Sequence, residues 1–207
     1  MSSRTDTSSD FAVEVTKQGP GYNAPQKMGK KLWAPMWVMA IMAFPTALVL
    51  GIVRSNAISS GEAETTIASL GHVTTGVMFI GFTAVFAAIS FAIARILGEF
   101  RKGGGEIQEL VSDKVVTLKM PPTAKIFILG MAMAMMTLLV ASIIHLVVGA
   151  QVASGGISLG SAETAAINLE AVRRLGVAVY LLAITFGLAT ITKVLRFQAI
   201  RVRELAS

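Results

Sequence analysis

"IFILGMAMAMMTLLVASIIHLVV", residues 126 to 148, contains no Asp, Glu, Lys or Arg, and His145 is the one imidazole in it. A helix needs roughly 20 mainly apolar residues to cross the hydrocarbon core of a bilayer. The apolar residues run continuously, whereas the strands of a membrane barrel alternate apolar and polar residues. The stretch therefore predicts a membrane-spanning helix over residues 126 to 148.

Three further stretches have the same character, and the composition of the whole chain agrees with them. They cover residues 33 to 53, 72 to 94 and 175 to 193. Of the 207 residues, 54% are hydrophobic and only 14% are charged, while soluble domains are about one quarter charged. We therefore predict an all-α, polytopic membrane protein with four transmembrane helices in a bundle, which fills residues 32 to 196.

The polar segments outside these spans divide the rest of the chain. Residues 1 to 31 are rich in Ser, Thr, Gly and Pro, which predicts a disordered cytoplasmic segment. Residues 197 to 207 are expected to form a cytoplasmic tail. In the loop after the second span, the glycines of "RKGGGE" are expected to end the helix, and Ile107 to Val115 to form a short surface helix.

The distribution of positive charge predicts the topology. Of the 18 Lys and Arg residues, only Arg54, Arg173 and Arg174 lie on one side of the proposed spans. Because positive residues are retained in the cytoplasm, both termini are predicted to be cytoplasmic, in a protein of the cell (inner) membrane. The net charge is +6, but the basic residues are mixed with acidic ones and have no aromatic residues between them, so nucleic acid is not expected as a partner. The expected partners are membrane lipids and other membrane protein subunits.

The two halves of the chain resemble each other. "GEAETTI" precedes the second span and "GSAETAAI" precedes the fourth, and Gly76 and Phe86 recur as Gly176 and Phe186. The "AET" match lies outside the apolar stretches, where chance agreement is less frequent. We therefore expect two duplicated helical hairpins.

Two histidines lie on helix faces made of small residues, and two explanations compete for them. Small residues let membrane helices approach closely, so His72 and His145 would be interhelical hydrogen-bonding residues. The alternative is a haem b bound by both imidazoles, with the small side chains leaving room for the porphyrin. The residues expected to form the packing faces are Gly76, Ala84, Ala88, Ala92, Gly130 and Ala134.

The remaining charged residues near the outer ends of the spans suggest no further site. Carboxylates at Glu62, Glu64, Glu163 and Glu170 could join the histidines in a metal site, but nothing in their spacing makes them converge, so none is predicted. Arg173 and Arg174 are expected to pair with acidic residues of the outer loops.

The sequence points away from catalysis. It contains no cysteine, no phosphate-binding glycine loop and no HExxH motif, and the predicted spans hold no Asp or Glu. We therefore expect a non-catalytic integral membrane subunit that packs through small-residue helix faces within a larger membrane complex. A haem-bearing electron-transfer subunit is the first alternative, and a small transporter or channel is the second.

Overall fold

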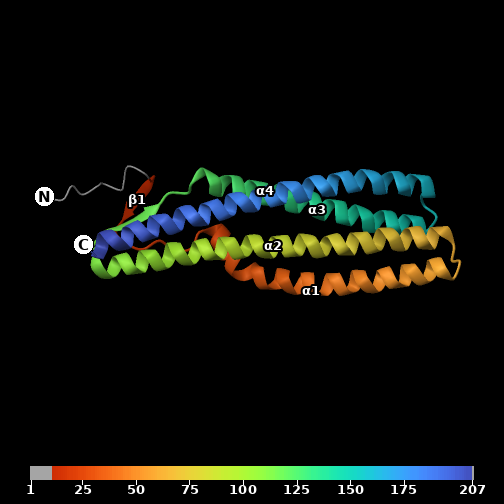
Figure 1. Ribbon diagram of the computed structural model, residues 1–207, viewed down its shortest axis with the longest axis horizontal. Coiled ribbons are helices and arrows are strands. Elements are labelled where there is room, and N and C mark those ends of the chain that lie inside the picture. The colour runs from red at the N-terminus through yellow and green to blue at the C-terminus, as the bar shows by residue number, and fades with distance from the viewer. Residues whose placement is uncertain (1–10, 207) are drawn as a thin grey trace. The chain divides into compact units, whose positions relative to one another are not determined.

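The computed structural model of the chain describes residues 11 to 206 and is dominated by four long helices (Figure 1). The elements in order are β1 (Val13–Thr16), α1 (Ala24–Ser59), α2 (Glu64–Val111), β2 (Val115–Leu118), α3 (Pro122–Ala153) and α4 (Leu159–Ala206). All four helices are long and apolar enough to cross a membrane, and each contains one of the predicted spans. The prediction of four such helices is therefore confirmed.

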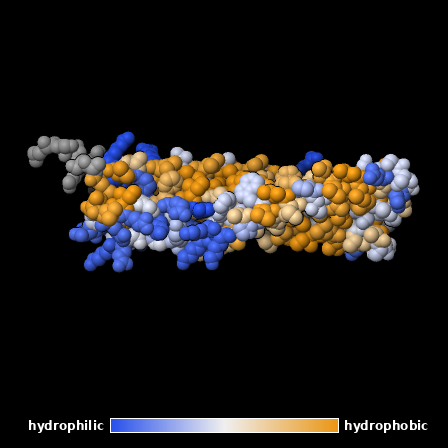
Figure 2. All heavy atoms as spheres, turned by 90° about the horizontal axis from the view of Figure 1, so that it is seen from below, coloured by the Kyte–Doolittle hydropathy of each residue, from blue (hydrophilic) through white to orange (hydrophobic). Residues whose placement is uncertain are grey.

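Many large apolar side chains of these helices are exposed rather than buried. In α1, Ile41, Met42 and Leu48 are each more than 60% exposed, and Leu129 and Met136 of α3 are similar. Figure 2 shows apolar residues covering much of the visible face. Exposed apolar surface on this scale is rare in soluble monomers, and it is what a helix in contact with lipid presents.

The helices extend further than the sequence predicted. The second helix was expected to end at the glycines, but α2 continues through Gly103 to Gly105 and ends at Val111, so no separate helix begins at Ile107. Two of these glycines permit close packing: a Cβ at Gly104 would collide with the side chain of Gln198, and one at Gly105 would lie 2.8 Å from Pro20 Cδ, whereas a Cβ at Gly103 would meet nothing within 4 Å. The close approach offsets the cost of glycine in a helix, which is about 1 kcal/mol each relative to alanine. At the other end of the chain, α4 runs through the predicted tail.

The N-terminal segment is partly structured where disorder was predicted. Residues 1 to 10 lie outside the described residues, but β1 pairs antiparallel with β2, from Val13 opposite Leu118 to Thr16 opposite Val115. The start of α1 is a capping box, in which the Asn23 side chain accepts from Gln26 N–H and the Gln26 side chain accepts from Asn23 N–H, both at 3.0 Å. This box begins the helix nine residues before the predicted span at Trp33.

The described chain forms two compact units, and each of the four helices contributes to both. Unit 1 comprises the chain up to Trp33, Ser90–Leu129 and the chain from Ala183 onward. Unit 2 comprises Ala34–Ile89 and Gly130–Leu182.

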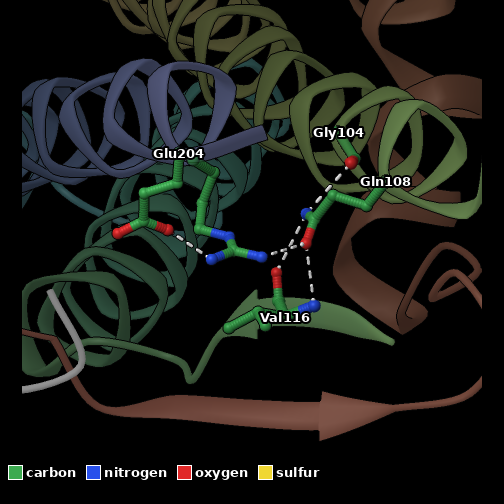
Figure 3. A network of polar contacts seen from close by, with 5 residues as sticks. Gly104, Gln108, Val116 and Glu204 are labelled. Atoms are coloured by element: carbon green, nitrogen blue, oxygen red, sulfur yellow. Dashed lines mark hydrogen bonds and ion pairs between the residues drawn. The ribbon is translucent and has the colours of Figure 1, made fainter. Parts of the chain in front are cut away.

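Unit 1 is organised around the side chain of Gln108, which is only 2% exposed. Its amide donates to the carbonyls of Gly104 and Val116, each at 3.0 Å, and accepts from the Val116 N–H at 2.9 Å (Figure 3). Arg201 donates to the Gln108 oxygen at 3.2 Å and pairs with Glu204. One buried amide therefore joins α2, β2 and α4, and all of its hydrogen-bonding groups are used.

In unit 2 the helices pack through small residues. The face that α1 turns inward is made of Ala40, Ala43 and Ala47, all buried, and Gly81 of α2 lies against Ala43 and Phe44. A Cβ at Gly176 of α4 would lie only 2.9 Å from Leu138 Cδ2 of α3. Small side chains thus let the backbones come close together, as membrane helices commonly do.

The two hairpin turns of unit 2 have the same geometry. Gly61 after α1 and Gly155 after α3 both have φ of +71°, a left-handed conformation that favours glycine. In each turn the N–H of this glycine and the N–H of the next residue donate to carbonyls of the last helical turn. In the first turn Gly61 donates to Ile58 and Glu62 to Ala57, and in the second Gly155 donates to Val152 and Gly156 to Gln151. Both helices therefore end in a Schellman motif.

Candidate functional site

The candidate site lies in unit 2, where α2 and α3 come close enough for their histidines to meet. A Cβ at Gly76 would lie 2.9 Å from Leu146 Cδ2, and one at Gly149 would lie 2.9 Å from Val73 Cγ2. The Ser69 hydroxyl also donates to the Gly149 carbonyl across the two helices at 2.8 Å. Glycines on both sides of the pair therefore set the distance between the helices.

His72 and His145 form a direct, buried contact. Their Nδ1 atoms lie 3.0 Å apart. His72 is only 7% exposed and His145 only 2%. The His72 ring lines the same cavity as Ala162 of α4. The two histidines were expected either to hydrogen-bond between helices or to bind a haem, and the structure places their rings in contact.

The contact itself requires one donor and one acceptor. A neutral imidazole carries one proton, so one of the two Nδ1 atoms donates and the other accepts, according to the tautomers of the rings. With Nδ1 of each ring used in this contact, Nε2 of His145 is a buried atom without a hydrogen-bond partner.

Arg173 is the third buried polar residue of the site. It is 8% exposed, and its guanidinium lies over the ring of Phe79, 4.3 Å from the centroid. Its Nε and Nη1 atoms are buried without hydrogen-bond partners. The expected loop pairing is found only at the next residue, because exposed Arg174 pairs with Glu170 one turn earlier on α4.

These groups line a cavity of about 520 Å³. Its wall includes the apolar or small residues Ile67, Ala68, Gly71, Leu159, Ala162 and Ala166. Its charged lining consists of Arg54, Glu64, Glu163, Glu170 and Arg173, together with the two histidines. All of these carboxylates are exposed, while Arg173 and the histidines are buried. The lining of the cavity therefore combines three exposed carboxylates and the exposed cation Arg54 with the buried cation Arg173.

The predicted packing residues lie mostly within the protein. Ala84 and Ala88 have no exposed surface, Ala134 is 1% exposed and Gly76 is buried against Leu146. Ala92 and Gly130 are half-buried. The small-residue faces are thus used between the helices of this chain.

The arrangement of the two histidines bears on the haem and metal predictions. The facing nitrogens are in hydrogen-bond contact, so no porphyrin plane fits between them as they are placed. Binding one iron through both rings would require the pair to separate, and haem b stays a prediction for an absorption spectrum to test. Within residues 11 to 206, no three His, Asp or Glu side chains are grouped so that they could hold a metal ion.

Comparisons with protein-family models, with curated proteins and with solved structures find no match to this chain. The assignment of a function therefore depends on the site itself.

Proposed function

We propose that the chain is a multi-pass integral membrane protein, without catalysis of its own, that binds a small polar ligand in the cavity at His72, His145 and Arg173. The observation that carries this proposal is the buried guanidinium of Arg173, which has two nitrogens without partners beside an apolar ring. Burying an ion without hydrogen-bond partners costs several kcal/mol. A protein that acts only by packing would gain nothing from that cost, whereas a ligand with acceptor atoms would offset it.

The site also has the features of a membrane binding site. Ionisable residues within membrane helices are rare, and they face the protein interior or a water-filled cavity where they handle ions or substrates. Here three such residues come from α2, α3 and α4, and they line one cavity. Convergence from three helices is harder to explain by packing than a single polar contact between two helices.

Membership in a larger membrane complex is a separate part of the proposal. Supporting it, the apolar span of α1 is only 17% buried, against 28 to 44% for the other three helices. This outer face of α1 is available to lipid or to another subunit. Co-purification from native membranes in mild detergent tests it, and a chain that elutes alone at every detergent concentration would contradict it.

Native mass spectrometry of the purified protein tests ligand binding. We expect the wild-type protein to retain a small-molecule adduct that Arg173→Gln loses, because the substitution removes the cation that holds the ligand. Arg174→Gln is the matched control, since Arg174 is adjacent but exposed. If Arg173→Gln does not fold, Arg173→Lys replaces it, because lysine keeps the charge without the planar guanidinium. A wild-type protein that carries no adduct and binds no added ligand would disprove the binding function.

A further inference from the structure

The cavity contains two buried polar residues with unsatisfied nitrogens. The Nε and Nη1 atoms of Arg173 are hydrogen-bond donors without an acceptor. The Nε2 atom of His145 has no partner either, and it is an acceptor in the tautomer in which His145 Nδ1 donates to His72. Both residues are more than nine-tenths buried, and both line the cavity. A ligand that satisfies the site must therefore bring an acceptor to Arg173 and, with that tautomer, a donor to His145.

The acceptor required at Arg173 is an oxyanion. A guanidinium matches carboxylate and phosphate oxygens through paired N–H groups, and these charge-assisted bonds are about twice as strong as neutral ones. A water molecule could donate to His145, but it would leave the buried positive charge of Arg173 without a counter-charge. Phosphate or carboxylate oxygens supply both the acceptor and the charge.

The exposed lining of the cavity favours a positive group on the same ligand. It holds the cation Arg54 and three carboxylates, of which Glu170 pairs with Arg174. Glu64 and Glu163 form no ion pair with another described residue. These two carboxylates outnumber Arg54, so they would attract an ammonium group, whose N–H groups can also donate to His145 Nε2 in its acceptor tautomer.

The depth of the cavity suits a ligand with separated charges. Glu163 precedes Arg173 by ten residues on α4, which is about 15 Å along a helix at 1.5 Å per residue. Both side chains are long enough to shorten that gap. A ligand that contacts both residues must therefore carry its anionic and cationic groups at opposite ends.

We propose that this cavity binds a zwitterion, with its oxyanion on Arg173 and its ammonium group toward His145 and the carboxylates of Glu64 and Glu163. This inference rests on the proposed binding function and specifies its ligand. Two sources share the chemistry: a soluble zwitterion, and the phosphoethanolamine headgroup of a membrane lipid.

Thermal unfolding of the full-length protein in maltoside detergent tests the charge requirement with three probes. O-phosphoethanolamine carries both charges, inorganic phosphate only the anion and ethanolamine only the cation. We expect O-phosphoethanolamine to raise the midpoint temperature of unfolding by several degrees and to bind at least ten-fold more tightly than phosphate. Ethanolamine should have no effect.

Nanodiscs distinguish a lipid from a soluble ligand. They contain either phosphatidylethanolamine or phosphatidylglycerol with the same acyl chains. Retention of one phosphatidylethanolamine identifies the lipid as the source, and a shift with the soluble probe identifies a soluble ligand.

Substitutions assign the two ends of the ligand. Arg173→Gln should abolish binding of O-phosphoethanolamine, and Glu163→Gln should weaken it about ten-fold without weakening phosphate. Arg174→Gln and Glu62→Gln are the controls, because neither residue lines the cavity.

Two results would overturn the zwitterion in favour of a site for a plain anion. One is phosphate binding as tight as that of O-phosphoethanolamine, and the other is tighter anion binding in Glu163→Gln. A retained adduct of another chemistry, with no response to these probes, would also overturn it but would leave the binding function standing. Absence of both adduct and response would remove both proposals.

Discussion

At the scale of single residues, the contact between His72 and His145 combines a structural role with the polarity of the cavity. Their hydrogen bond joins α2 to α3. Because His145 uses Nδ1 in this bond, its Nε2 is the nitrogen left for a ligand.

Substitution of His145 should show how much this link contributes to stability. His145→Asn places an amide near the position of Nδ1 and should keep most of the stability, because an amide can either donate to His72 or accept from it. His145→Leu leaves His72 Nδ1 buried without a partner and should destabilise by about 1 kcal/mol, since polar contacts in membrane helices average about 0.6 kcal/mol and an orphaned buried group costs about 1 to 3. Denaturant titration in mild detergent measures both.

A double substitution provides the control for this prediction. Replacing both partners of a buried hydrogen bond by apolar groups costs less than the two single changes together. His72→Leu combined with His145→Leu should therefore destabilise by less than the sum of the single variants. Strict additivity would mean that the contact contributes nothing to stability.

The two histidines could be identified from the sequence, but the burial of Arg173 was missed. Arg173 and Arg174 were both expected to lie in a loop, because the predicted span began at Leu175. The structure starts α4 at Leu159 and turns inward a stripe with alternating spacings of three and four, in which Ala166 is half-buried and the others are buried: Ala162, Ala166, Leu169, Arg173, Gly176, Tyr180 and Ala183. Arg173 lies on this stripe and Arg174 does not. The periodicity of small residues on both sides was the signal that could have separated them.

At the scale of elements, the sequence predicted the four apolar helices but not their ends. Continuous apolar stretches without charges leave little choice of structure in a membrane. The ends depend on capping and on contacts between distant segments. The box of Asn23 and Gln26 was visible as an N-x-x-Q pattern, whereas no local pattern shows that Gln198 covers Gly104 or that Gln108 holds β2.

Two alanines of α3 offer a matched test of the packing faces. Ala134 is 1% exposed and Ala132 is exposed, and both lie in unit 2. Ala134→Leu should destabilise the protein by about 1 to 3 kcal/mol, because extra methylene groups in a packed interface displace their neighbours. Ala132→Leu should change stability by less than about 0.5 kcal/mol. Equal effects of the two substitutions in the same denaturant titration would contradict the small-residue packing.

At the scale of the whole molecule, the two hairpins share more than their "AET" motif. The Schellman turns at Gly61 and Gly155 have the same φ and the same pair of hydrogen bonds. Glu64 and Glu163, which belong to the two copies of the motif, line the same cavity. A duplication of one hairpin remains a prediction, and it would explain why the site receives equivalent residues from α2 and α4.

The topology determines which side of the membrane the cavity faces. Positive residues concentrate before the apolar span of α1, between the apolar spans of α2 and α3, and at the end of α4, so the hairpin turns and the cavity opening are predicted to face away from the cytoplasm. The chain has no cysteine, so single introduced thiols give an unambiguous signal. A cysteine at exposed Ser154, in the turn after α3, should react with a membrane-impermeant maleimide in intact cells. A cysteine at exposed Gln18 should react only after permeabilisation. Labelling of Gln18→Cys alone in intact cells would reverse the topology and place the cavity on the cytoplasmic side, where a ligand would have to come from the cell interior.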